Sequence, residues 1–229
     1  MTVLFDNHIE TDFSEFDSES VDEPADLTWS ADAALVGSGG AKNVVDGTGQ
    51  TWLQSNMGSW STQFLHIRFW FDPNGMTIGD ADEFRLMQSA GREMVVNFGY
   101  TTAGGYWLEA EAENDSGAKV GTGQYALSDE PHFIEYRMRR NDDAGTPNAE
   151  VSLYVDGNLQ ETKGSLDIFD WTRPPHCRVG LCSGFDTGMS GTFYFDEIKG
   201  IDTDDLIDGP VSGLDVVLVD HHLRQLANN

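Results

Sequence analysis

The chain has 229 residues, and 39% of them are apolar, which suffices for a hydrophobic core and argues against a disordered protein. It carries 39 acidic and 13 basic residues, and the net charge of −26 repels nucleic acid and anionic membrane surfaces. Its apolar runs fall well short of the roughly 20 residues of a transmembrane helix. We therefore expect no nucleic-acid partner and no membrane insertion.

The N-terminal region is polar and strongly acidic. Residues 1–16 have neither a basic start nor a long apolar stretch, so they do not resemble a secretory signal peptide. Residues 10–26 are dense in Asp and Glu and are predicted to form a solvated loop. Any location outside a cell is therefore expected to be reached without a signal peptide.

Eight short runs further along the chain predict β-strands. Each is rich in aromatic and β-branched residues, and turn-forming Gly, Pro, Asn and Asp separate one run from the next. Closely spaced strands of this kind are typical of an antiparallel sandwich. The runs cover residues 64–71, 83–88, 93–100, 106–113, 132–140, 150–157, 177–182 and 192–200.

Several of these runs alternate apolar and polar side chains, as do 132–140 and, most clearly, 106–113. Because successive side chains of a strand point to opposite sides, this pattern places one face in a core and the other in water. The fold class is therefore predicted to be all-β, a two-sheet antiparallel sandwich. In 106–113 one face has Tyr106, Leu108, Ala110 and Ala112, and the other has Trp107, Glu109, Glu111 and Glu113.

The two cysteines and the C-terminal region show no sign of a separate functional site. Cys177 and Cys182 lie five residues apart on a predicted strand, so their side chains would face opposite ways. We expect both to be ordinary small residues rather than a disulfide or a metal site. Residues 201–229 begin as a linker and end in a short tail, which is expected to dock on the sandwich or on a neighbouring subunit.

Four segments occur in an order that matches a known family. Ile9–Phe16 lies near the start, His132–Met138 and Leu153–Asn158 follow, and Gly191–Ile198 lies near the end. Together they resemble concanavalin A-like lectin and glucanase domains, which include laminin-G-like modules. The resemblance covers about residues 1–200 and implies a jelly roll with a concave front sheet and a convex back sheet. The remainder is then a short C-terminal extension.

The glutamates of 106–113 are the first candidate site. Alternate residues on a strand project about 6.5–7 Å apart, whereas retaining glycosidases hold two carboxyl groups roughly 5–5.5 Å apart. The laminarinase-like branch of the resembling family implies Glu109 as nucleophile, Glu111 as its helper and Glu113 as acid/base. However, the middle acid is Glu rather than Asp, and the intervening residues are small alanines. We therefore expect a solvated or glycan-contacting face and no enzyme activity.

Glycan binding is the second candidate. Trp107 shares the side of Glu109 and Glu111, and an aromatic ring can stack on the apolar face of a sugar. Arginines on a second alternating strand would add hydrogen-bond donors. The alternative is a plain solvated face, with the aromatic rings packed in the core or at its rim. The predicted glycan-binding residues are Trp107, Glu109, Glu111, Arg137 and Arg139.

A structural calcium ion is the third candidate, although no cofactor is required. The resemblance implies ligands from a first-strand glutamate, a glycine-rich loop and a last-strand aspartate, here Glu10, residues 36–40 and Asp196. Oxygen ligands of this kind suit calcium. The alternative is that both carboxylates only accept hydrogen bonds. No His/Cys cluster has zinc spacing, and no Ser-His-Asp or Cys-His nucleophile signature stands out.

These observations favour a non-catalytic structural or adhesive module on the surface of a particle, such as a phage or virus capsid decoration or tail protein with glycan binding. A surface-type fold without an export signal is compatible with assembly inside a cell followed by lysis. The expected partners are other subunits, in a homo-oligomer or on a scaffold, and a polysaccharide. The expected location is a virion or an extracellular surface. The alternatives are a soluble lectin module and a laminarinase-like glycoside hydrolase.

Overall fold

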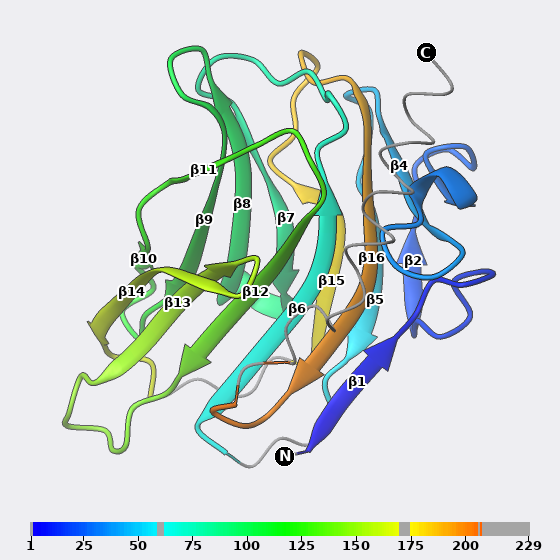
Figure 1. Ribbon diagram of the computed structural model, residues 1–229. Coiled ribbons are helices and arrows are strands. Elements are labelled where there is room, and N and C mark those ends of the chain that lie inside the picture. Colours follow the sequence, from blue (N-terminus) through cyan, green and yellow to red (C-terminus); the bar gives the residue numbers. More distant parts are fainter. Residues whose placement is uncertain (1, 59–61, 170–174, 206, 208–229) are drawn as a thin grey trace.

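The computed structural model of the protein describes residues 2–58, 62–169, 175–205 and 207. Within them the chain forms sixteen β-strands and two 3-10 turns, Ala31–Ala33 and Ala90–Arg92. The strands make two antiparallel sheets of eight strands each, stacked face to face (Figure 1). The predicted all-β sandwich is therefore confirmed. Among the described residues no helix has the length and apolarity needed to cross a membrane.

Sheet A has the strand order β14-β13-β12-β6-β16-β4-β3, and β1 pairs with one end of β16. In Figure 1 it lies in front, with β16 and β6 at its centre. Its strands are β1 (Val3–Asn7), β3 (Leu27–Ser30), β4 (Gly40–Val45), β6 (Phe64–Asp72), β12 (His132–Arg139), β13 (Ala149–Val155), β14 (Asn158–Leu166) and β16 (Gly191–Ile201).

Sheet B has the strand order β10-β9-β8-β7-β15-β5-β2, and β11 pairs with β9. It lies behind sheet A in Figure 1. Its strands are β2 (Ser18–Ser20), β5 (Thr51–Asn56), β7 (Glu83–Ser89), β8 (Met94–Thr101), β9 (Gly105–Glu113), β10 (Lys119–Gly121), β11 (Tyr125–Leu127) and β15 (His176–Ser183).

All eight predicted strands are present, as β6, β7, β8, β9, β12, β13, β15 and β16. The prediction of a loop over residues 10–26 is wrong in part, because this segment contains β2. This strand has the polar sequence Ser-Glu-Ser and lies at the edge of sheet B, where it pairs with β5. Strand β2 is held by backbone hydrogen bonds to β5 and needs no buried face, so its sequence shows no alternation of apolar and polar residues.

The core lies between the sheets and is rich in phenylalanine. Phe71 and Phe193 come from sheet A, and Phe84 and Phe98 come from sheet B. The rings of Phe71 and Phe98 meet edge to face, with centroids 4.8 Å apart. Burying aromatic area of this kind holds the two layers together. Tyr136 of β12 also crosses the core and donates a hydrogen bond of 3.1 Å to the carbonyl of Glu111 in β9.

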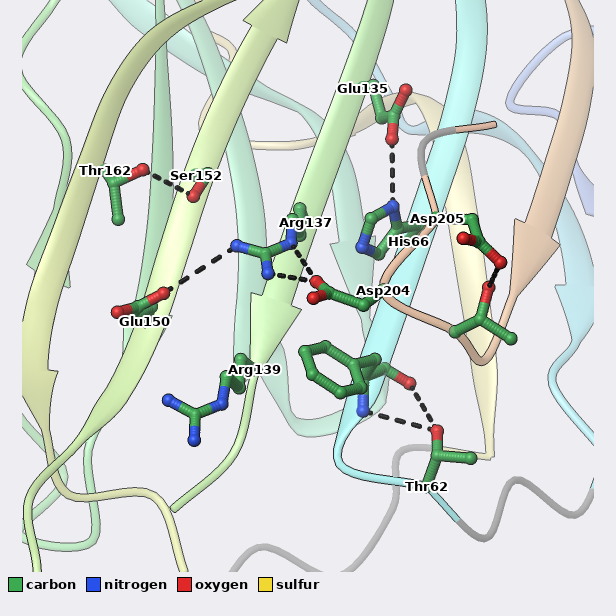
Figure 2. A network of polar contacts seen from close by, with 12 residues as sticks. Thr62, His66, Glu135, Arg137, Arg139, Glu150, Ser152, Thr162, Asp204 and Asp205 are labelled. Carbon is green, nitrogen blue, oxygen red and sulfur yellow. Dashed lines mark hydrogen bonds and ion pairs between the residues drawn. The ribbon is translucent and has the colours of Figure 1, made fainter. Parts of the chain in front are cut away.

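The outer face of sheet A departs from the predicted wet surface at Glu135, which is only 1% exposed. Its carboxylate lies 2.9 Å from the buried ring of His66 on β6 (Figure 2). The backbone N–H of Ile207 lies 3.5 Å from the same carboxylate, so the segment after β16 approaches this face. The first residues of the predicted linker therefore contact the sandwich, whereas residues 208–229 of the predicted tail lie outside the described part of the chain.

Candidate functional site

The outer face of sheet B gathers polar side chains in rows across neighbouring strands. Pairing places Arg85 of β7 opposite Asn97 of β8, and Asn97 opposite Glu109 of β9. Directly opposed residues on adjacent strands point to the same side of a sheet. Arg85, Asn97 and Glu109 therefore form one row of charged and polar groups on the side away from the core.

A depression of about 540 Å³ lies on this face, and Arg85 and Asn97 of the row line it. The residues that line the depression belong to four strands of sheet B, namely β7, β8, β9 and β10. Residues at the end of β15 line its remaining side. The polar residues that line it are Glu83, Arg85, Asn97, Glu111, Lys119 and Ser183. Cationic, anionic and amide groups thus face the same small volume.

A set of hydrogen bonds holds the floor of this face. Arg85 Nη1 donates to Ser183 Oγ at 3.3 Å, and Ser183 Oγ donates to Gln88 Oε1 at 3.1 Å. Further along the sheet, Arg178 Nε donates to Gln54 at 3.0 Å, and the Arg178 guanidinium lies 4.1 Å above the Trp52 ring. These contacts restrict the side chains before any ligand arrives, which reduces the entropy lost on binding.

The electrostatics of the face centre on Glu109. Partial burial, followed by the negative charges of Glu111 and Glu83, raises the pKa of Glu109 to about 7. Burial and Glu111 also raise the pKa of Glu83. A carboxyl with a pKa near 7 exists in both forms at neutral pH, so Glu109 can donate or accept a hydrogen bond there.

Trp107, which is predicted to stack on a sugar, is almost fully buried. Its side chain is 5% exposed and lies against Gly99 of β8, where an added Cβ would be 2.3 Å from the Trp107 ring. Gly99 therefore provides the space in which the ring lies flat on the sheet. Only Glu109 and Glu111 of the three predicted residues on β9 are accessible to a ligand on this face.

The predicted arginines lie on the opposite surface of the molecule. Arg137 belongs to β12 of sheet A, where its guanidinium pairs with Asp204 and lies 3.7 Å from Glu150 (Figure 2). Arg139 pairs with Asp142 at 3.0 Å. The structure therefore does not bring the five predicted residues together, because they are divided between the two stacked sheets, and their role in glycan binding stays a prediction.

The structure assembles cationic and amide groups that the sequence analysis did not select, namely Arg85, Asn97 and Lys119. Each interrupts or borders an apolar strand at a position that alternation assigns to the outer face. That signal is present in the sequence around Arg85 and Asn97. Which residues meet across strands, however, depends on register and strand order, and a single sequence does not specify these.

The three glutamates of the alternative hydrolase prediction do share the outer side of β9. Glu113 lies 3.5 Å from Lys119 Nζ in an ion pair, whereas Glu111 lines the depression. The raised pKa of Glu109 suits a proton donor better than the nucleophile role that the family resemblance implied. Their catalytic roles remain predictions.

The two predicted calcium ligands meet the same loop. Asp196 Oδ2 accepts hydrogen bonds from the backbone N–H groups of Leu35 and Val36, at 3.2 and 2.9 Å. Glu10 follows β1 rather than belonging to a strand, and its Oε2 accepts from Ser38 N and Oγ at 2.8 and 2.7 Å. Both carboxylates thus anchor the loop, and among the described residues no three acidic, His or Cys side chains cluster as metal ligands. The calcium site remains a prediction.

The two cysteines bear out the expectation of ordinary small residues. Both are free and buried. Burial raises the pKa of Cys177 well above its ordinary value and that of Cys182 to about 12. Neither thiol therefore has the thiolate character of a reactive site.

The sequence matches no known family model and no curated protein. Several solved structures have a similar fold. An endo-β-1,4-glucuronan lyase from the fungus Trichoderma reesei is 12% identical, with a TM-score of 0.67 over 88% of this chain and 96% of its own. A conserved carbohydrate esterase from the Shiga toxin-encoding bacteriophage phi24B is 15% identical, with a TM-score of 0.59 over 88% of this chain and 99% of its own.

The receptor-binding domain of a botulinum neurotoxin C/D mosaic serotype is 9% identical, with a TM-score of 0.59. The match covers 97% of this chain and 51% of that one, so this chain spans about half of that domain. At such low identities these structures show the fold alone. They agree with the concanavalin A-like sandwich that the sequence resembles, and similar folds occur both in carbohydrate-active enzymes and in receptor-binding domains.

Proposed function

We propose that the protein binds a carbohydrate on the outer face of sheet B. The observation that carries this proposal is the depression of about 540 Å³ lined by Arg85, Asn97, Glu111 and Lys119. Its volume lies in the range of about 300–1,000 Å³ common for ligand sites. Its mixture of fixed donors and acceptors suits the hydroxyl groups of a sugar, which both donate and accept hydrogen bonds.

The wider proposal is a surface role, in which this face attaches a particle such as a phage or virus to a polysaccharide. The fold resembles those of neurotoxin receptor-binding domains and of a bacteriophage carbohydrate esterase, which supports such a role. Under this proposal the protein forms a regular oligomer or co-purifies with particles. A strictly monomeric protein that never accompanies a particle would contradict the surface role and leave saccharide binding intact.

Cleavage of the bound saccharide is a second candidate. Enzymatic activity is possible for this fold, since similar structures are polysaccharide lyases and an esterase. The specific observation in its favour is the pKa of about 7 at Glu109, because general acids and bases work best near the operating pH. Under this candidate Glu109→Gln abolishes the release of shorter oligosaccharides, whereas under binding alone no oligosaccharide is released by the unmodified protein.

Affinity electrophoresis against a panel of neutral and acidic polysaccharides tests the binding proposal. We expect retardation by at least one polysaccharide, and loss of about tenfold in affinity in Arg85→Ala, equivalent to about 1.4 kcal/mol. Arg139→Ala is the matched control, because it removes an arginine from the opposite sheet. Equal losses in both variants, or no retardation by any polysaccharide, would contradict the proposed site.

A further inference from the structure

Ser128, His132 and Asp156 form a hydrogen-bonded relay away from the outer face of sheet B. Ser128 Oγ lies 2.8 Å from His132 Nε2, and His132 Nδ1 lies 2.8 Å from Asp156 Oδ2. Each distance is that of a good hydrogen bond. Hydroxyl, imidazole and carboxylate thus follow one another in the order found in serine hydrolases.

The fold brings these residues together from three places. Ser128 follows β11, where the chain leaves sheet B, and His132 is the first residue of β12 in sheet A. Asp156 lies in the tight turn between β13 and β14, with a positive φ of 53° that Gly157 continues at 74°. Asp is among the residues that tolerate this backbone conformation. The relay therefore lies at the crossover between the two sheets.

The carboxylate is held in a way that orients the imidazole. Asp156 Oδ1 accepts a hydrogen bond from Phe133 N at 2.9 Å, which leaves Oδ2 for His132 Nδ1. Burial raises the pKa of Asp156, but hydrogen bonds from His132 and Phe133 outweigh it, and the net pKa is lowered. An ionised Asp156 favours the proton on Nδ1, so Nε2 is free to accept the proton of Ser128.

The solvent exposure of Ser128 and His132 suits the roles of a nucleophile and its general base. Ser128 is exposed, whereas the His132 side chain is only 13% exposed. A histidine that served only to brace the Asp156 turn would need no contact with a surface serine. The exposed residues Asp129 and Glu130 directly follow Ser128 in the chain, so the surroundings disfavour an anionic substrate.

We propose that Ser128 is the nucleophile of an esterase site that acts on neutral carboxylic esters. Ser128 Oγ attacks the carbonyl carbon while its proton passes to His132 Nε2. The ester C–O bond then breaks, and His132 gives that proton to the departing alcohol. Water, deprotonated by His132, releases the acid from acyl-Ser128 and restores the hydroxyl. The sum is ester plus water to acid plus alcohol.

Hydrolysis of p-nitrophenyl acetate, with labelling by a fluorophosphonate probe and peptide mapping, tests this site. We expect the probe on Ser128 and a rate at least about 10²-fold above that of Ser128→Ala. Because Ser128 is exposed, this variant should fold normally. Ser116→Ala is the matched control, since Ser116 is exposed and its hydroxyl donates to Asn114 rather than to a histidine.

The variant Asp156→Asn distinguishes a catalytic relay from hydrogen bonds that serve only the structure of the surface. The side-chain amide of this variant can still accept a hydrogen bond from Phe133 N, so the melting midpoint should not change. It favours the His132 proton on Nε2 instead of Nδ1, however, so both labelling and hydrolysis should fall. Equal rates for the unmodified protein and Ser128→Ala, or labelling that persists in Asp156→Asn, would overturn the proposal. Neither result depends on saccharide binding, which is measured separately.

Discussion

At Glu109, burial and several neighbouring negative charges act on one carboxyl group. Partial burial removes solvent, and Glu111 and Glu83 add negative charge, so the pKa rises to about 7. The folded protein therefore retains a proton between an ordinary pKa of 4.5 and about 7 that the unfolded chain releases. The stability associated with this proton is complete below the ordinary pKa and is lost as the pH rises through that window.

Replacement of Glu109 by Gln removes this destabilising charge. We expect the variant to be more stable than the unmodified protein at pH 8 by about 1 kcal/mol, a small value because solvent screens a half-exposed group. The gain should disappear at acid pH, where the unmodified carboxyl is also neutral. Urea unfolding at several pH values measures it. A variant that is less stable at pH 8 would contradict the raised pKa.

Trp107 is almost fully buried against its own sheet. With 5% exposure and a ring held against Gly99, its removal leaves a cavity. We expect Trp107→Ala to lower the free energy of unfolding by about 3 kcal/mol and to change saccharide affinity far less than Arg85→Ala. Denaturant unfolding and affinity electrophoresis measure the two effects. Loss of binding with unchanged stability would restore the predicted stacking role.

At the scale of elements, sequence patterns predicted the central strands and missed the edge strands together with the interior strands β4 and β5. Alternation in β9 and β12 is strong because each strand has one face on the core. Edge strands such as β2 form by backbone pairing and carry no such signal. The predicted site residues are separated for a related reason. Arg137 and Glu109 both lie on outer faces, and only the strand order shows that these faces are opposite.

The loop at residues 35–38 is the element on which the calcium prediction can be tested. Bound calcium would stabilise the folded protein by mass action. If calcium binds here, a chelator lowers the melting midpoint of the protein and added calcium restores it. An Asp196→Asn variant should then lose the response to chelator. An unchanged midpoint in the unmodified protein would reject the calcium site and leave the hydrogen bonds from Leu35, Val36 and Ser38 as the anchors of the loop.

At the scale of the whole molecule, the net charge of −26 acts on stability. Like charges spread over a compact surface repel each other, and salt screens that repulsion within about 10 Å at 0.1 M. We expect the melting midpoint to rise when sodium chloride is added at low ionic strength. Differential scanning calorimetry measures this effect, and a fall in the midpoint would show that screened ion pairs matter more than net repulsion.

The molecule as a whole presents two different outer faces. On sheet A the arginines are paired with acids, and the chain after β16 approaches the surface. On sheet B a depression gathers donors and acceptors from four strands. The proposed saccharide site therefore lies on sheet B and not on sheet A.

A crystal structure of the protein with an oligosaccharide from the polysaccharide it binds tests this assignment most directly. We expect sugar hydroxyls within hydrogen-bond distance of Arg85, Asn97 and Glu111. A sugar bound on sheet A, against Arg137 and Arg139, would contradict it.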